Sequence, residues 1–213
     1  MIATFALRLI CGMSLFWLIM PRREVTSGFF RIQMLVTLGL SVLAAVAMDW
    51  GESEPGRAVP DRADTARLGL LLCVLLAVCS FLGSAAWILE RRTAGTVFAA
   101  MVFALATAAL LSSAVSLETA ATGLGVLRLA SELSASAMLG GAMVGMLLGH
   151  WHLTSPTMSI APLSRVNVAF GVAGLVRLAL SAVALALVWD RLGGTTHLVW
   201  LTMRWTAGIM GPL

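Results

Sequence analysis

Long apolar runs dominate this sequence and constrain its fold more than any other feature. The chain of 213 residues is 60% hydrophobic and only 11% charged, a composition that leaves too little polar surface for a soluble globule. A helix needs about 20 apolar residues to cross a bilayer, and runs of this length recur along the whole chain. The sequence therefore predicts an all-α fold, a polytopic transmembrane helix bundle of about seven spans. We place the spans at 2–20, 29–48, 67–89, 95–116, 127–150, 166–189 and 198–213.

Tryptophans and one polar segment mark the limits of these spans. Indole rings prefer the headgroup region, and several lie near predicted span ends: Trp17, Trp50, Trp87, Trp151, Trp189 and Trp200. Segment 49–66 is rich in proline, glycine and acidic residues, so we interpret it as a solvated loop. No linker or repeat divides the chain, which predicts a single transmembrane domain over 1–213. The last run is short and lacks a polar tail, so either the chain is a fragment or this helix is short or re-entrant.

Residue types absent from the sequence exclude several classes of protein. All 14 basic residues are arginines, and a retinal or pyridoxal Schiff base requires a lysine amine. The arginines lie singly or in pairs at the ends of apolar runs, a pattern that suits lipid headgroups and not nucleic acid. Cys11, Cys73 and Cys79 lie within apolar runs without CxxC spacing, so we interpret them as packing residues and not as a disulfide or zinc site.

The distribution of arginines predicts the orientation of the chain in the membrane. One set of connections, after spans one, three and five, carries Arg22, Arg23, Arg31, Arg91, Arg92 and Arg165. The other connections carry Arg57, Arg62, Arg67, Arg128 and Arg191, most of them offset by acidic residues. Cytoplasmic loops carry the excess of basic residues. This bias predicts an outside N-terminus and places the sequence HWHLTSP at the cytoplasmic face.

Segment 149–165, GHWHLTSPTMSIAPLSR, holds two of the three histidines. On a helix His150 and His152 point about 200° apart, so at most one of them can ligate a given iron. The remaining candidate for a second axial ligand, His197, falls on the opposite face of the membrane, which disfavours haem b within one chain. His150 from two copies could still meet across a twofold axis. The alternative is that a helix ends here in the interfacial region, terminated by Thr154, Ser155 and Pro156.

A stripe of small residues precedes these histidines. Ala137, Gly141, Gly145 and Gly149 follow one another at four-residue steps, a spacing that lets another helix approach backbone to backbone. The stripe predicts close packing against a helix of the same chain, against another membrane subunit or a second copy, or against a flat cofactor.

Charged side chains inside the predicted spans are the strongest candidates for a ligand site. A charge at the centre of a transmembrane helix costs about 2.5–3.5 kcal/mol, so each one should face the bundle or a partner. Glu132 can neutralise one arginine, and the surplus would suit a haem propionate, a lipid phosphate or a quinone carbonyl. The alternative is that the arginines reach the surface or bond backbone carbonyls of their neighbours. These residues are Arg8, Glu132, Arg177 and Arg204.

The segment LLGHWHLTSPTMSIAPLSR resembles a GHW-x-L-x-x-P-x-M-x-x-x-PL segment of uncharacterised bacterial multi-pass membrane proteins, which implies a bacterial cytoplasmic (inner) membrane location. The HL-x-x-P pattern at His152, Leu153 and Pro156 is also similar to helix ends in the membrane anchors of molybdopterin oxidoreductases. This second likeness implies a quinone-linked role in electron transport and supplies no site residues.

These observations predict a non-catalytic integral membrane subunit of a quinone- or haem-linked redox assembly. No HExxH, GxSxG or P-loop motif and no paired intramembrane carboxylates indicate an active site of its own. The candidate contacts for a quinone or haem b are His150, His152 and Arg177. One alternative is a small transporter or a lipid-phosphate-binding protein with an anion site at Arg8, Glu132 and Arg204. A purely structural or assembly factor is the other alternative. The expected partners are the lipid bilayer and other membrane subunits or a second copy.

Overall fold

The computed structural model describes residues 2–21, 24–52, 60–114, 123–155, 159–188 and 203. The regular elements in these residues are all α-helices: α1 (Ile2–Ile19), α2 (Ser27–Glu52), α3 (Pro60–Ile88), α4 (Arg92–Ala114), α6 (Gly123–Thr154) and α7 (Ala161–Val188). Six helices in this part of the chain are long and apolar enough to cross a membrane. The all-α fold of a multi-pass membrane protein is therefore confirmed. The seventh run, 198–213, lies outside the described residues apart from Met203, so the count of seven stays a prediction.

Apart from α1, the helices extend beyond the apolar runs that predicted them at one end or at both. Both α2, which ends at Glu52, and α3, which begins at Pro60, reach into the predicted loop 49–66. Proline is favoured at the first position of a helix because its missing N–H has no partner there in any case. Helix α6 continues through the histidine segment to Thr154. Hydropathy marks the hydrocarbon core and not the helix, so polar turns at helix ends fall outside a span prediction.

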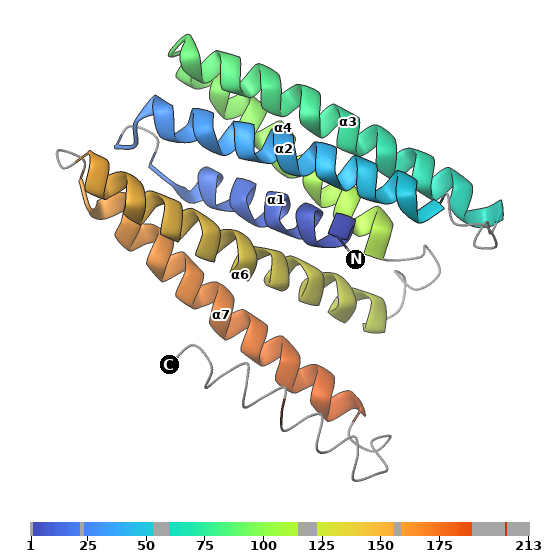
Figure 1. Cartoon of the computed structure of the whole chain (residues 1–213). Helices are drawn as coiled ribbons and strands as arrows, with labels where there is room; N and C mark the ends of the chain where they lie inside the picture. Colours follow the sequence, from blue (N-terminus) through green and yellow to red (C-terminus); the bar gives the residue numbers. More distant parts are fainter. Residues whose placement is uncertain are drawn as a thin grey trace. The chain divides into compact units, whose positions relative to one another are not determined.

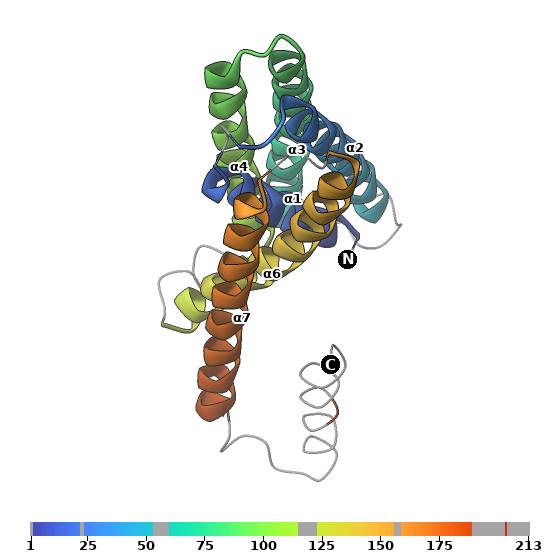
Figure 2. The same ribbon diagram turned by 90° about the vertical axis from the view of Figure 1, so that its left-hand side faces the viewer.

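The first helix lies at the centre of the bundle. Met1–Arg177 form one compact unit, and Leu178–Leu213 form a second. Within the first unit α1 packs against α2, α4 and α6, while α3 packs against α2 and α4 (Figures 1 and 2). The buried residues of α1 lie on all sides of the helix, among them Leu7, Ile10, Met13, Phe16 and Trp17. A helix that is apolar all round is expected to be surrounded by others, and α1 meets that expectation.

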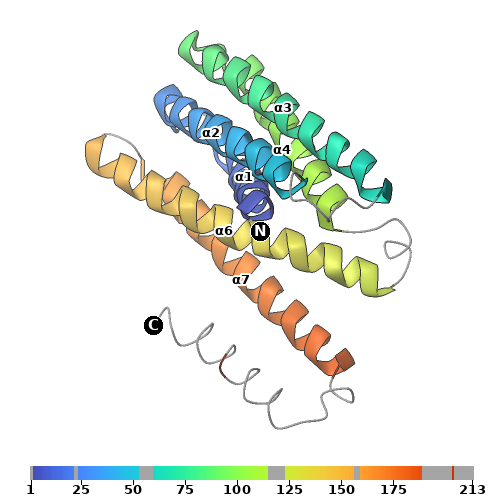
Figure 3. The same cartoon turned by 45° about the vertical axis from the view of Figure 1, so that its right-hand side comes forward.

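Two glycines set the closest approach in the bundle. A Cβ atom on Gly12 of α1 would overlap the backbone carbonyl of Ser136, and a Cβ on Gly140 of α6 would overlap the backbone of Gly12 and Met13. Figure 3 shows α1 and α6 as neighbours, with α2 and α3 on the other side of α1. Because no side chain separates the two backbones, α1 and α6 cross in direct contact.

The C-terminal end of α6 packs against the N-terminal end of α2. The Trp151 indole N–H donates to the Thr26 hydroxyl at 2.9 Å, and the Trp151 ring meets Phe29 edge to face at 6.0 Å. The C-terminal end of α6 and the N-terminal end of α2 therefore lie at the same side of the bundle. This arrangement agrees with an alternating path through the membrane.

Cysteine labelling of intact cells tests the orientation predicted from the arginines. A cysteine introduced at Ser53, in the α2–α3 connection, should react with an impermeant maleimide from outside, and one at Thr93 at the start of α4 should be protected. The native cysteines Cys11, Cys73 and Cys79 are buried and provide a low background. The reverse labelling pattern would mean that the chain is inserted with its N-terminus inside.

Candidate functional site

Two of the predicted intramembrane charges form an ion pair between α1 and α6. Arg8 donates from Nε to Glu132 Oε2 at 2.7 Å and from Nη2 to Oε1 at 2.8 Å. This paired geometry is the strongest form of an arginine–carboxylate contact. The Arg8 side chain is 34% exposed and the Glu132 side chain 17%. The pair lies one helical turn from the contact of Gly12 with α6, so it joins the two helices where their backbones are closest.

The third charge, Arg177 of α7, binds the residue next to Glu132. Its Nη1 donates to the Ser131 carbonyl at 2.8 Å and to the Ser131 hydroxyl at 2.5 Å, with Ser134 Oγ at 3.5 Å. A contact with a polar group on another helix is what an intramembrane guanidinium requires. The backbone carbonyl is the partner expected under the alternative in which Arg177 has a structural role.

Together these contacts form one charge cluster, consisting of Arg8, Glu132, Ser131 and Arg177. It joins α1, α6 and the first part of α7 through side chains that are costly to leave unpartnered in a membrane. Its Glu132 carboxylate neutralises Arg8, as the sequence predicted for one arginine. The fourth predicted charge, Arg204, lies outside the described residues, so its place in an anion site stays a prediction.

The candidate histidines lie far from this cluster. His150 is exposed and His152 half-buried in the last turns of α6, and α6 ends two residues later at Thr154. Nineteen residues of helix separate Ser131 from His150, a rise of about 28 Å. One cofactor head group therefore does not contact both Arg177 and His150. The other candidate axial ligand, His197, lies outside the part of the chain that the structure describes.

The predicted small-residue stripe packs within the chain over part of its length. Gly141 lies against Phe16 of α1 and Phe170 of α7, and the nearest atoms to a Cβ on Gly145 belong to Val166 and Asn167 of α7 at 3.7 and 3.9 Å. A Cβ on Gly149 would have no atom within 4 Å. The most crowded glycine of α6 is Gly140, which is not part of the stripe.

Buried polar residues of α2 and α3 were missed by the sequence analysis. Gln33, Thr37 and Ser41 of α2 and Ser80 and Ser84 of α3 are all buried. Their four-residue spacing within apolar runs was a readable signal, because it places them on one face of each helix. Polar residues that face a membrane bundle are expected to bind a neighbouring helix or a ligand.

No group of three or more histidine, cysteine or acidic side chains in the described residues is placed to hold a metal ion. Comparison with known protein families, with curated proteins and with solved structures finds no match to this chain. The candidate sites are therefore the charge cluster of α1, α6 and α7 and those buried polar side chains of α2 and α3 that have no hydrogen-bond partner, Gln33, Thr37 and Ser80.

Proposed function

We propose that this chain is a non-catalytic integral membrane subunit of a quinone-linked redox assembly. The proposal that the subunit is non-catalytic rests on one observation, the way in which the described intramembrane charges are bonded. Arg8 is neutralised by Glu132, and Arg177 is bound to the carbonyl and hydroxyl of Ser131. Charged groups engaged in this way hold helices together and are not arranged around a reacting substrate.

The redox part of the proposal rests on the similarity of the His152–Pro156 segment to the membrane anchors of molybdopterin oxidoreductases. A quinone is favoured over haem b because the described histidines lie at one end of α6 and point in different directions. A bis-histidine haem would need a second ligand at the same depth from another helix or another copy. A quinone needs only hydrogen-bond donors within the bundle.

Purification under mild conditions tests this proposal. The tagged full-length chain is extracted in a mild detergent, and the polypeptides that co-purify are identified by mass spectrometry. The proposal expects a redox subunit among them, and an absorption spectrum without a Soret band would favour quinone over haem. A chain that purifies alone, both before and after chemical crosslinking in the membrane, contradicts the proposal.

One observation favours a second candidate, a protein that binds a lipid phosphate. A third of the Arg8 side chain is exposed on the bundle, and a guanidinium at such a position can bind a phosphate. Native mass spectrometry of the parent and of Arg8→Gln distinguishes this candidate. Retention of an anionic phospholipid by the parent alone supports it, and equal lipid content contradicts it. If neither a partner nor a ligand is retained, the structural or assembly role is the remaining interpretation.

A further inference from the structure

Polar side chains without hydrogen-bond partners gather inside the bundle at α1, α2 and α3. One is the Trp87 indole N–H of α3. The others are the Trp17 indole N–H, both amide atoms of Gln33 and the hydroxyls of Thr37 and Ser80, none of which has a partner in the described structure. Gln33 is 1% exposed, and the side chains of Trp17, Thr37 and Ser80 are fully buried. Buried polar groups are almost always hydrogen-bonded, so each exception requires an explanation such as a bound ligand or water. We call Trp17, Gln33, Thr37 and Ser80 the buried polar cluster.

The register of α2 and α3 places two members of this cluster opposite each other. Glycine contacts fix the register, because Met48 lies against Gly69 and Met34 lies against Gly83. Moving along α2 by fourteen residues thus corresponds to moving back along α3 by fourteen, as in an antiparallel pair. The same register places Thr37 at the level of Ser80. The two hydroxyls therefore lie at one depth in the interface between α2 and α3.

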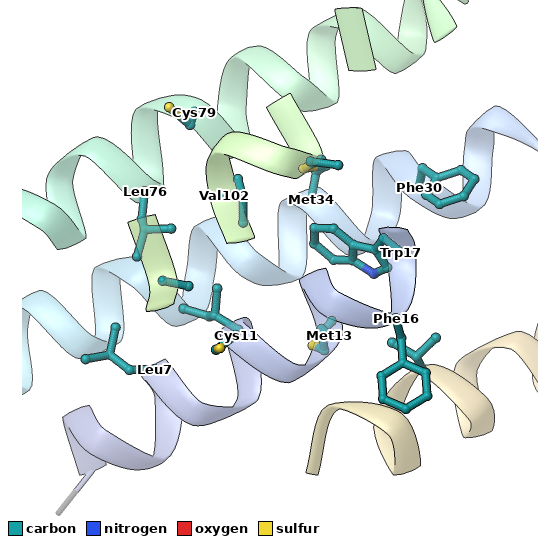
Figure 4. Close-up of a cluster of buried hydrophobic side chains, with 14 of the residues drawn as sticks. Leu7, Cys11, Met13, Phe16, Trp17, Phe30, Met34, Leu76, Cys79 and Val102 are labelled. Carbon is teal, nitrogen blue, oxygen red and sulfur yellow. The ribbon is translucent and has the colours of Figure 1, made fainter. Parts of the chain in front are cut away.

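Aromatic side chains lie at one end of the same region. Trp17 of α1 lies beside Phe30 and Met34 of α2, the latter being the neighbour of Gln33 in the chain (Figure 4). Phe30 in turn stacks on Trp87 of α3, with ring centroids 4.6 Å apart and an interplanar angle of 15°. Aromatic rings of three helices thus lie near the Gln33 end of the buried polar cluster, whereas Thr37 and Ser80 lie about 10 Å further along α2 and α3 than the Phe30–Trp87 stack.

The side chains of the buried polar cluster favour an uncharged ligand. None of the buried side chains described in α1, α2 and α3 carries a charge, and a buried ion without a countercharge is strongly disfavoured. The indole N–H, the amide NH₂ and the two hydroxyls all donate hydrogen bonds. A cation is disfavoured, because the cluster offers only three side-chain oxygens as ligands and has an N–H donor beside them. A flat molecule with carbonyl acceptors satisfies both the donors and the aromatic faces.

We propose that the buried polar cluster binds the head group of a lipid-soluble quinone, with the quinone carbonyls accepting hydrogen bonds from Trp17, Gln33, Thr37 and Ser80. Gln33 lies six residues inside α2, about 9 Å from its start at Ser27. A head group at this depth lies near the membrane face, and its isoprenoid tail stays in the hydrocarbon region.

Met34 is the most adaptable side chain next to the buried polar cluster. Its thioether lies against Gly83 in the α2–α3 interface, and methionine is the most adaptable apolar side chain because it has three rotatable bonds. Binding of a head group in this interface therefore requires Met34 to rotate away from Gly83. The ligand thus replaces a flexible side chain.

This inference rests on the proposed redox role, which gives the bound quinone its use. Quinone binding itself can be measured with the purified chain alone. The full chain, purified in detergent, is titrated calorimetrically with a short-tailed benzoquinone and, separately, with an alcohol that carries the same tail. We expect saturable binding of the quinone only. Gln33→Leu should bind at least about tenfold more weakly, because an apolar side chain of similar volume removes the amide donor.

Matched variants separate a binding effect from a folding effect. Thr37→Val and Ser80→Ala should each weaken binding severalfold. Ser41→Ala is the control, because Ser41 lies on the same buried face of α2 but donates its hydroxyl to the Thr37 carbonyl at 2.7 Å. Its affinity should equal that of the parent. Without ligand, Gln33→Leu should unfold at the same temperature as the parent or higher, because it removes an unpartnered amide from the interior.

Two results would overturn the inference. One is absence of saturable quinone binding by the folded parent, including the case in which ordered water alone occupies the cluster. The other is unchanged affinity in Gln33→Leu, Thr37→Val and Ser80→Ala, which would place the quinone elsewhere. Neither result affects the proposed role as a membrane subunit, which depends on the co-purifying redox subunit. Conversely, quinone binding by a chain without partners would support this site and contradict that role.

Discussion

Gly140→Leu should leave almost no folded protein in detergent. The Cβ of any residue at position 140 would overlap the backbone of Gly12 and Met13 in α1. Side-chain overcrowding alone costs about 1–3 kcal/mol when neighbours can rotate away, but a backbone can yield only if the whole helix moves. Since α1 lies at the centre of the bundle, its displacement also disturbs α2 and α4. The measurement is the yield of monodisperse protein after size-exclusion chromatography.

Gly149→Leu is the matched control for this experiment. It places the same side chain on the same helix, at a position where a Cβ has no atom within 4 Å, so its yield should equal that of the parent. Gly145→Leu should fall between the two, because Val166 lies 3.7 Å from its Cβ position. Equal yields of Gly140→Leu and Gly149→Leu would mean that α1 and α6 do not cross at Gly12.

The small-residue stripe shows what a glycine pattern can and cannot predict. The spacing of Ala137, Gly141, Gly145 and Gly149 correctly indicated that α6 allows close approach, and Gly141 indeed lies between phenylalanines of α1 and α7. The tightest contact nevertheless uses Gly140, one residue away. Adjacent glycines point about 100° apart on a helix, so the choice between them depends on where the partner helix lies. That position is set by the whole bundle and is not encoded in the local spacing.

Membrane spans were the most predictable part of the fold. In a bilayer every backbone polar group must be bonded within its own helix, so apolar length alone nearly determines where a helix crosses. Each of the first six predicted runs accordingly overlaps one of the six candidate spans over most of its length. Pairing of helices is a different problem, because lipid tails are as apolar as leucine and composition does not select a neighbour. The central place of α1 was for this reason not predicted.

The cost of an intramembrane charge made part of the candidate site predictable. It predicted that each charge faces the bundle or a partner and that Glu132 can neutralise one arginine, and the structure pairs Glu132 with Arg8 and bonds Arg177 to Ser131. It did not indicate that Arg8 is the arginine concerned, because three arginines satisfied the same argument. The neutral polar residues of the buried polar cluster were missed because the charge argument considers ionised side chains alone, although the four-residue spacing of Gln33 and Thr37 places both on one face of α2.

Glu132→Leu should destabilise the bundle by roughly 3 kcal/mol, because it leaves the Arg8 guanidinium without its carboxylate in a largely apolar setting. The double variant Arg8→Met with Glu132→Leu should recover most of this loss. Replacement of a buried ion pair by apolar residues of similar volume is often neutral or stabilising, whereas removal of one partner strands a charge. Arg8→Met alone should also destabilise, since it strands the Glu132 carboxylate.

Thermal unfolding of the parent, the two single variants and the double variant in the same detergent completes the cycle. The structure predicts strong coupling, with a double variant more stable than either single one, because Arg8 and Glu132 contact each other through two hydrogen bonds. Ser112→Ala on α4 serves as a control, since its hydroxyl bonds only the Ala109 carbonyl within its own helix among the contacts described. Additive effects of the two charge substitutions would show that each residue acts separately, and the ion pair would then not join α1 to α6.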